Sequence, residues 1–146
     1  MKTFPDFSSP TKPAQRITFN DKSIMVVDDD PLQVQTILRV LRSTGCHLAG
    51  STNPNSFLRW LSINNPDLVI LDVMMPDIDG WEVFRRMRAS PRHQNTPVIF
   101  LTGIAAPDEE DFFNLGPGNC RLLAKPVHHE GLLDTIEELL TTAAAA

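Results

Sequence analysis

Side chains that can take part in chemistry stand at the ends of four apolar segments of this 146-residue chain. Three adjacent aspartates, Asp28–Asp30, follow the run IMVV, and Asp72 follows LVIL. Thr102 follows VIFL, and Lys125 follows RLLA. Carboxylates, one hydroxyl and one ammonium therefore recur at the same place relative to a hydrophobic run. If the fold brings the run ends together, this set can bind a cation and a phosphate.

A cluster of carboxylates needs a compensating cation, because like charges repel. Two carboxylates about 4 Å apart repel by about 4 kcal/mol at an effective dielectric constant near 20. Mg²⁺ suits such a cluster, because it takes one or two carboxylates and a phosphate oxygen while it keeps several waters. Asp28, Asp29 and Asp72 are the candidate ligands. Asp30 is expected instead to cap the next helix, with Pro31 at the first helical position.

The apolar runs are typical of buried parallel strands. Each is a continuous run rather than an alternation, as expected where both faces of a sheet are covered. Four strong strands and one weaker strand (46–51) are expected, at 24–27, 46–51, 68–71, 98–101 and 121–124.

Between the strands, apolar residues recur at the spacing of helices. Val34, Ile37 and Leu41 follow this spacing in the first helix, and Gly45 is placed to end it. Further helices are expected after Pro54, around 83–87, at 107–116 and at 130–140.

The alternation of strands and helices predicts an α/β fold of the (βα)₅ type. In such a fold a parallel sheet carries helices on both faces. Ligands of these doubly wound sheets bind beyond the carboxyl ends of the strands. Functional residues are therefore expected just after the first, third, fourth and fifth strands, which is where the carboxylates, the hydroxyl and the ammonium stand.

The composition predicts one globular domain in the cytoplasm. No apolar run approaches the roughly 18–20 residues needed to cross a bilayer, so membrane insertion is not expected. The net charge of −5 argues against direct binding to nucleic acid, whose phosphates would repel the chain. Two cysteines, Cys46 and Cys120, make neither a disulfide framework nor a zinc site, and both are expected in the core.

The domain boundaries follow from a change in pattern. Residues 1–22 hold three prolines among serine, threonine and lysine, which predicts a flexible N-terminal tail or linker. The segment RITF at 16–19 is apolar enough to dock on the domain, but we assign it to the tail. The regular pattern covers residues 23–141, and residues 142–146 form a short C-terminal tail.

Four motifs in fixed order connect the chain to a known family. VVDDD, ILDVMMPDIDG, FLTG and AKP follow one another. Their polar residues Asp28, Asp72, Thr102 and Lys125 are separated by 44, 30 and 23 positions. Over residues 23 to about 141 the chain resembles the receiver domain of two-component response regulators. The resemblance implies a chemotaxis-regulator-like, flavodoxin-like five-stranded sheet with strand order 2-1-3-4-5. It also implies a signalling switch, not an enzyme beyond its own phosphorylation and dephosphorylation.

The resemblance assigns roles to the acidic residues. Asp72 matches the phospho-acceptor, which takes a phosphoryl group from a histidine kinase or a histidine phosphotransfer protein. Asp28 and Asp29 match the pair that holds Mg²⁺, with Asp72 and the backbone carbonyl of Met74 as further ligands.

The remaining site residues match donors to the phosphoryl group. Lys125 matches the lysine that pairs with a phosphoryl oxygen, and the bond from Lys125 to Pro126 matches one that is commonly cis. Thr102 matches the hydroxyl that turns towards the acyl phosphate. Partners are then expected to be an output protein or a second copy, bound through the face of helix four, strand five and helix five.

The match departs from the family near this face. Leu122 occupies the position three residues before the lysine, where the family usually has an aromatic side chain. Gly103 replaces a usual alanine, and the loop at 114–121 is rich in glycine. The alternative interpretation is a pseudo-receiver that binds proteins without being phosphorylated. A flavin-binding protein of the same fold is discarded, because three aspartates after the first strand would repel the flavin phosphate.

Two other motifs receive structural interpretations. The segment DIDG at 77–80 lacks the spacing of a calcium loop and follows Pro76 rather than a buried strand, so we expect a turn and a helix N-cap. The pair His128 and His129 stands at a helix start, where adjacent side chains point in different directions. We expect both histidines to be exposed to solvent.

Overall fold

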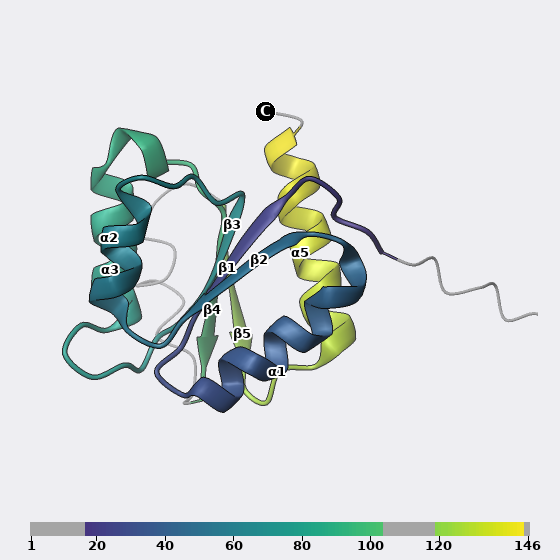
Figure 1. Ribbon diagram of the computed structural model, residues 1–146, viewed down its shortest axis with the longest axis horizontal. Helices are drawn as coiled ribbons and strands as arrows, with labels where there is room; N and C mark the ends of the chain where they lie inside the picture. The colour runs from purple at the N-terminus through teal and green to yellow at the C-terminus, as the bar shows by residue number, and fades with distance from the viewer. Residues whose placement is uncertain (1–16, 104–118, 145–146) are drawn as a thin grey trace, which may run out of the picture.

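A computed structural model describes residues 17–103 and 119–144. Its centre is a five-stranded parallel sheet with the order β2-β1-β3-β4-β5, as the resemblance implied (Figure 1). The carboxyl ends of the strands meet at one edge of the sheet, the lower edge in Figure 1. The strands are β1 Ser23–Val27, β2 His47–Ser51, β3 Leu68–Asp72, β4 Val98–Thr102 and β5 Cys120–Ala124.

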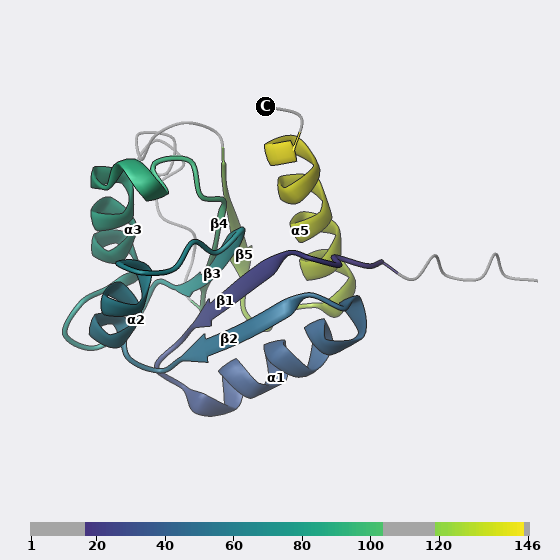
Figure 2. The same cartoon turned by 45° about the horizontal axis from the view of Figure 1, so that its top comes forward.

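The helices cover the sheet on both faces. Two views of the ribbon place α1 and α5 on one side and α2 and α3 on the other (Figures 1 and 2). The predicted helix at 107–116 and the loop that follows it lie outside the described residues. The described helices are α1 Pro31–Leu41, α2 Pro54–Leu61, α3 Gly80–Ala89 and α5 His129–Ala144, with 3₁₀ turns at Arg42–Thr44 and Pro91–His93.

The core consists of two apolar layers separated by the sheet. Alternate residues of each strand enter opposite layers, because successive side chains of a strand point to opposite faces. In β3, Ile70 packs under α1 and α5, whereas Leu71 packs under α2 and α3. All five residues of β3 and of β4 are buried, as the continuous apolar runs predicted.

The first three helices begin at capping residues that the sequence places directly after loops. Asp30 accepts a hydrogen bond from the Leu32 N–H, Asn53 caps α2, and Asp79 caps α3. These side chains satisfy backbone donors that the first turn of a helix leaves unpaired. The predictions that Asp30 is a cap and that DIDG forms a turn and an N-cap are therefore confirmed.

The first helix ends earlier than predicted. Regular α-helix stops at Leu41, and a 3₁₀ turn leads to Gly45, whose φ of 77° is left-handed. A 3₁₀ turn tightens the end of a helix, and glycine adopts the positive φ without strain. Gly45 thus ends the helical segment as predicted, although its α-helical part is shorter than predicted.

Residues before the predicted start of the domain pack against its core. The Phe19 side chain is 6% exposed and Ile17 packs beside it, both against the core layer under α1 and α5. The Phe19 N–H also donates to the Thr44 carbonyl at 2.7 Å. Composition had assigned this segment to the tail, whereas Ile17 and Phe19 lie against the domain core. At the other end α5 continues to Ala144.

Cysteines and histidines lie largely as expected. Cys120 is buried and Cys46 is half-buried, and both are free thiols. His128 and His129 are exposed at the start of α5. Among the described residues, no helix is long and apolar enough to span a membrane.

Candidate phospho-acceptor site

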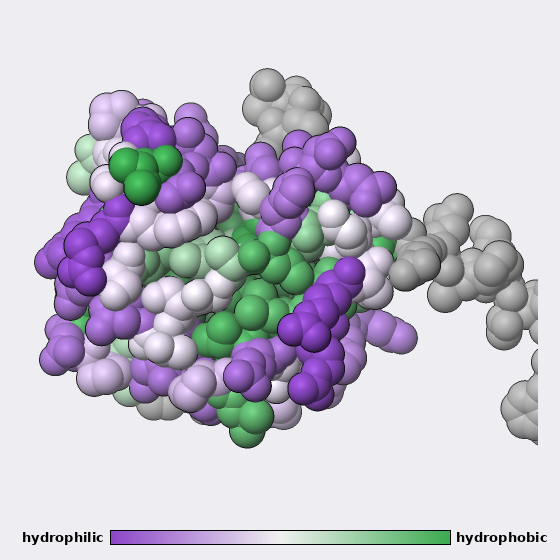
Figure 3. Space-filling model, viewed as in Figure 1, coloured by the Kyte–Doolittle hydropathy of each residue, from purple (hydrophilic) through white to green (hydrophobic). Residues whose placement is uncertain are grey.

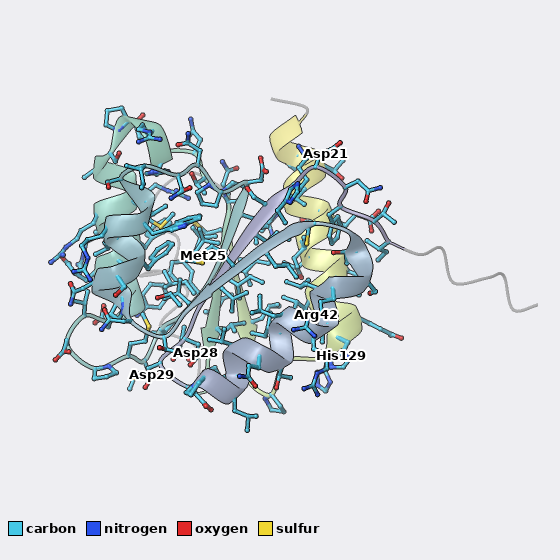
Figure 4. The ribbon with its side chains drawn as sticks, viewed as in Figure 1. Asp21, Met25, Asp28, Asp29, Arg42 and His129 are labelled. Carbon is cyan, nitrogen blue, oxygen red and sulfur yellow. The ribbon has the colours of Figure 1, made fainter. Side chains whose placement is uncertain are left out.

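Parallel strand topology brings the ends of β1, β3 and β5 to one edge of the sheet. β1 pairs with β3, β3 with β4, and β4 with β5, so Asp28, Asp72 and Lys125 follow strands that share this edge. Figure 4 labels Asp28 and Asp29 together at the end of β1, beside the start of α1. The bond from Lys125 to Pro126 is cis, as the resemblance implied.

The ammonium of Lys125 joins the two strand ends. Its Nζ donates to Oδ2 of Asp28 at 2.9 Å and lies 3.2 Å from Oδ1 of Asp72. The Lys125 side chain is 25% exposed, whereas the two aspartate side chains are almost completely buried. A charge-assisted contact in such a setting is shielded little by water, so Lys125 is the main neutralising group of the described site.

Backbone N–H groups also hold one carboxylate oxygen of each buried aspartate. Oδ1 of Asp28 accepts from the Asp30 N–H at 3.0 Å, and Oδ1 of Asp72 accepts from the Met74 N–H at 3.2 Å. Asp29 differs from its neighbour because it is exposed. Burial therefore ends between Asp28 and Asp29, and Asp30 is exposed as well.

The electrostatic environment of Asp72 is unfavourable for an ionised carboxylate. Burial, and then the charge of Asp28, raise the pKa of Asp72 from 3.8 to about 6, although Lys125 and the Met74 N–H act in the opposite direction. For Lys125, burial alone would lower the pKa. Its hydrogen bond to Asp28 and the charges of both aspartates outweigh burial and raise that pKa above its ordinary value.

The acidic cluster has a donor set that suits a magnesium ion. Asp28, Asp29 and Asp72 each offer a carboxylate oxygen, and these oxygens lie within 4.8 Å of one another. Two of the carboxylates are buried and one is exposed, so one side of the cluster is open to water. Hard carboxylate oxygens with room for retained waters match the preference of Mg²⁺.

Two further predicted residues lie at this edge. Thr102 is the last residue of β4 and is 5% exposed; its carbonyl accepts from the Lys125 N–H at 2.8 Å. Met74 follows Asp72 by two positions, and its side chain is 57% exposed. The structure therefore brings Asp28, Asp29, Asp72 and Lys125 together, with Thr102 and Met74 on adjoining segments of backbone.

The turn at 77–80 was predicted from the sequence, but the close approach of its glycine to the end of β3 was not. The Gly80 N–H donates to the Val73 carbonyl at 2.9 Å, and a Cβ on Gly80 would lie 2.3 Å from the carbonyl oxygen of Asp72. Only glycine permits this approach of α3 to the end of β3. In the same loop, Asp77 adopts a positive φ of 71°. The glycine in DIDG was the available signal, but its closeness to Asp72 depends on the tertiary fold.

The side chains near Leu122 include an aromatic group from another element. Leu122 lies opposite Phe100 in the pairing of β4 with β5, and it is half-buried against the core layer under α2 and α3. The Phe100 ring lies 4.5 Å from the ring of Trp81, in the first turn of α3. Among the described residues, Trp81 of α3 thus supplies an aromatic ring against Phe100, which lies two positions before Thr102 in β4.

With this fold and this acidic edge in place, comparison with known families gives one assignment. The response regulator receiver domain family matches residues 24–137, and this chain belongs to it. Among solved structures, the signal receiver domain of a signal transduction histidine kinase from Syntrophus aciditrophicus superposes with a TM-score of 0.74. It is 30% identical, and the match covers 83% of this chain and 91% of that one.

Relatives in sequence include both short and long proteins. The polar-differentiation response regulator DivK of Brucella anthropi is 25% identical over 123 residues, which are 84% of this chain and 98% of DivK. Protein RcaC of Microchaete diplosiphon is 32% identical over 105 residues, which are 71% of this chain but 16% of RcaC. The chain thus spans less than a fifth of the length of RcaC and nearly all of DivK.

Proposed function

We propose that this chain is a phosphorylatable receiver of a two-component pathway. In this proposal Asp72 accepts a phosphoryl group from a phosphohistidine of a histidine kinase or a histidine phosphotransfer protein, in the cytoplasm. The observation that carries the proposal is the contact of the Lys125 ammonium with both Asp28 and Asp72, within a cluster of three carboxylates. A lysine and an open acidic cluster around one buried carboxylate are what phosphoryl transfer to that carboxylate requires.

The transfer step uses the carboxylate of Asp72 as the nucleophile. A bond forms between its free oxygen and phosphorus while the bond from phosphorus to the histidine nitrogen breaks, and the imidazole leaves. Oδ1 of Asp72 is held by the Met74 N–H and lies near Lys125, which orients the carboxyl group before the reaction. Positioning of this kind contributes much of the catalysis of phosphoryl transfer.

The charges of the site favour the transferred group. Lys125 is positively charged and can follow the phosphoryl oxygens as charge develops on them. Asp28, Asp29 and Asp72 would hold Mg²⁺, with the Met74 carbonyl as a further ligand, and the ion would supply a second positive charge at these oxygens. The Thr102 hydroxyl would donate a hydrogen bond to the aspartyl phosphate, which carries close to two negative charges and several acceptor oxygens.

Phosphorylation would then change a binding surface. We assign that surface to helix four, β5 and α5, with Leu122 near its centre, and an output protein or a second copy as the partner. Leu122 packs against the core, so substitution by a charged residue also tests stability. Leu122→Asp should weaken the association of the phosphorylated protein, whereas Leu122→Ala should preserve more of it. If both folded variants associate as strongly as the wild type does, this surface is excluded.

The direct test is the intact mass of the protein after incubation with acetyl phosphate and Mg²⁺. We expect a gain of one phosphoryl group that disappears in Asp72→Asn and after removal of the metal by EDTA. Lys125→Arg should accept the group more slowly, because the guanidinium keeps the charge but not the shape of the ammonium. A folded, Mg²⁺-binding protein that gains no mass would refute the proposal and favour the phosphorylation-independent binding module.

A further inference from the structure

The outer edge of the sheet at β2 is open within the described part of the chain. β2 is the first strand in the order β2-β1-β3-β4-β5, and β1 is its one neighbour. The His47 N–H donates to the Lys22 carbonyl, and the Ser51 carbonyl accepts from the Asp28 N–H. The backbone groups of a strand alternate in direction, so those of His47, Ala49 and Ser51 face the sheet.

The intervening residues, Leu48 and Gly50, therefore direct their N–H and C=O groups away from the sheet. No other described strand pairs with this edge. Unpaired strand edges are templates for a further strand, and proteins often block them with lysine, proline or a bulge. β2, with the sequence HLAGS, contains neither lysine nor proline, and its pairing with β1 runs without interruption.

The surface around this edge is apolar at its centre. Figure 3 shows apolar surface in the middle of the face along which β2 runs, with hydrophilic side chains around it. Leu48 packs against the layer under α1 and α5, and Ala49 against the layer under α2 and α3, and both are half-buried. Gly50 allows α1 to approach closely, because a Cβ there would lie 2.6 Å from a methyl group of Val34.

The charge of this part of the chain is opposite to that of the remainder. Residues 31–66, which comprise α1, β2, α2 and their connections, contain no aspartate and no glutamate. They contain three arginines, Arg39, Arg42 and Arg59, all of them exposed. This segment therefore carries +3, and because the whole chain carries −5, the remaining residues carry −8. An acidic partner is attracted to this edge and repelled by most of the rest of the molecule.

We propose that the β2 edge is a docking site for an extended, acidic segment of a partner protein, which adds as a sixth strand. Main-chain hydrogen bonds to Leu48 and Gly50 hold the segment, its apolar side chains cover Leu48 and Ala49, and its carboxylates face the arginines of α1 and α2. Strand addition of this kind takes its affinity from the backbone and its specificity from alternate side chains. The site is independent of Asp72, which lies in the sheet at the end of β3.

The test uses an acetylated, amidated hexapeptide of alternating glutamate and valine, and the same peptide with lysine in place of glutamate. Amide hydrogen exchange and ¹H–¹⁵N shifts are followed at Leu48, Ala49 and Gly50. With nine-tenths of the protein bound to the acidic peptide, exchange at Leu48 and Gly50 should slow about tenfold, because only the free fraction exchanges. Ala49 already bonds to β1 and should change little. The lysine peptide should bind at least several-fold more weakly.

Two pairs of variants separate the hydrogen bonds from the charges. Leu48→Pro removes an N–H that β1 does not use, so it should abolish peptide binding, whereas Leu48→Ala keeps the N–H and should bind. The double variant Arg39→Gln, Arg59→Gln should bind the acidic peptide more weakly, by about two- to five-fold for each arginine. The control variant Arg85→Gln on α3 should bind it as tightly as the wild type does. The Arg39 and Arg59 variants keep the backbone intact, so they test the charge contribution even if Leu48→Pro does not fold.

Three results would overturn the proposal. One is that the lysine peptide binds as tightly as the acidic peptide. Another is that a folded Leu48→Pro variant binds the acidic peptide as the wild type does. The third is protection of Leu48 and Gly50 that rises with protein concentration alone, which would assign the edge to a second copy. Asp72→Asn should bind the acidic peptide like the wild type, so failure of phosphorylation and failure of docking are separate outcomes.

Discussion

The buried carboxyl of Asp72 lowers the stability of the metal-free protein at neutral pH, and Asp72→Asn should relieve that cost. The pKa of Asp72 is raised from 3.8 to about 6 by burial and by the charge of Asp28. A rise of one in the pKa corresponds to about 1.36 kcal/mol, so the ionised carboxylate costs the folded state up to about 3 kcal/mol. Asparagine has the same shape and carries no charge, and its oxygen can still accept from the Met74 N–H.

The sign of the effect depends on pH in a defined way. A folded-state pKa above the unfolded value means that the stability contributed by the protonated group is complete below about pH 4. It is lost as the pH rises through about 6. The advantage of Asp72→Asn should therefore be about 1–3 kcal/mol at pH 7.5 and should vanish near pH 4. Lys125 remains paired with Asp28 in the variant, so no buried charge loses all of its partners.

Urea denaturation in EDTA at several pH values, followed by circular dichroism, measures this difference. Asp77→Asn is the matched control, because it makes the same substitution at an exposed position of the loop that follows β3. Asparagine tolerates the positive φ found there, so the control should change stability by less than about 0.5 kcal/mol. The reasoning is wrong if Asp72→Asn is no more stable than wild type at pH 7.5, or if its advantage persists at pH 4.

Three further perturbations follow from the same site. Lys125→Ala leaves the buried Asp28 without its cation and should destabilise the protein by about 3 kcal/mol in urea denaturation at pH 7.5; no loss would mean that the ion pair is energetically neutral. Gly80→Ala places a methyl group against the Asp72 carbonyl and should cost about 1–3 kcal/mol, whereas Gly131→Ala on α5 meets no neighbouring atom and should stabilise slightly. In Trp60→Phe, Trp81 is the single tryptophan of the chain, and its emission should change when acetyl phosphate and Mg²⁺ are added, because its ring touches Phe100 near Thr102. An unchanged emission in a protein whose mass shows phosphorylation would mean that Trp81 does not respond to the site.

Most of the sheet and the location of the candidate site could be predicted from the sequence. Continuous apolar runs identify strands that are covered on both faces, and each polar residue at a run end then falls at one edge of the sheet. Phe19 could not be assigned, because the composition around it is that of a linker, while its burial depends on α1 and α5. The end of α1 was misplaced for a local reason, since periodicity does not separate a last α-turn from a 3₁₀ turn.

The sequence predicted which residues lie at the site better than it predicted the contacts between them. The resemblance gave Lys125 a role at a phosphoryl oxygen, but it did not indicate the hydrogen bond that Lys125 donates to Asp28 at 2.9 Å. The contact between Gly80 and the Asp72 carbonyl depends on how α3 packs on β3. Spacing along the chain specifies which residues reach an edge, whereas the pairing of their atoms is set by packing and by the balance of charges around them.

The ion pair between Lys125 and Asp28 joins residues that are 97 positions apart, and this separation has a consequence for synthesis of the chain. A ribosome makes Asp28 97 residues before it makes Lys125. Until β5 emerges, burial of Asp28 in a nascent sheet leaves its charge without the lysine, which is costly. The early strands therefore gain little by closing on their own, and completion of the fold is coupled to arrival of the last strand.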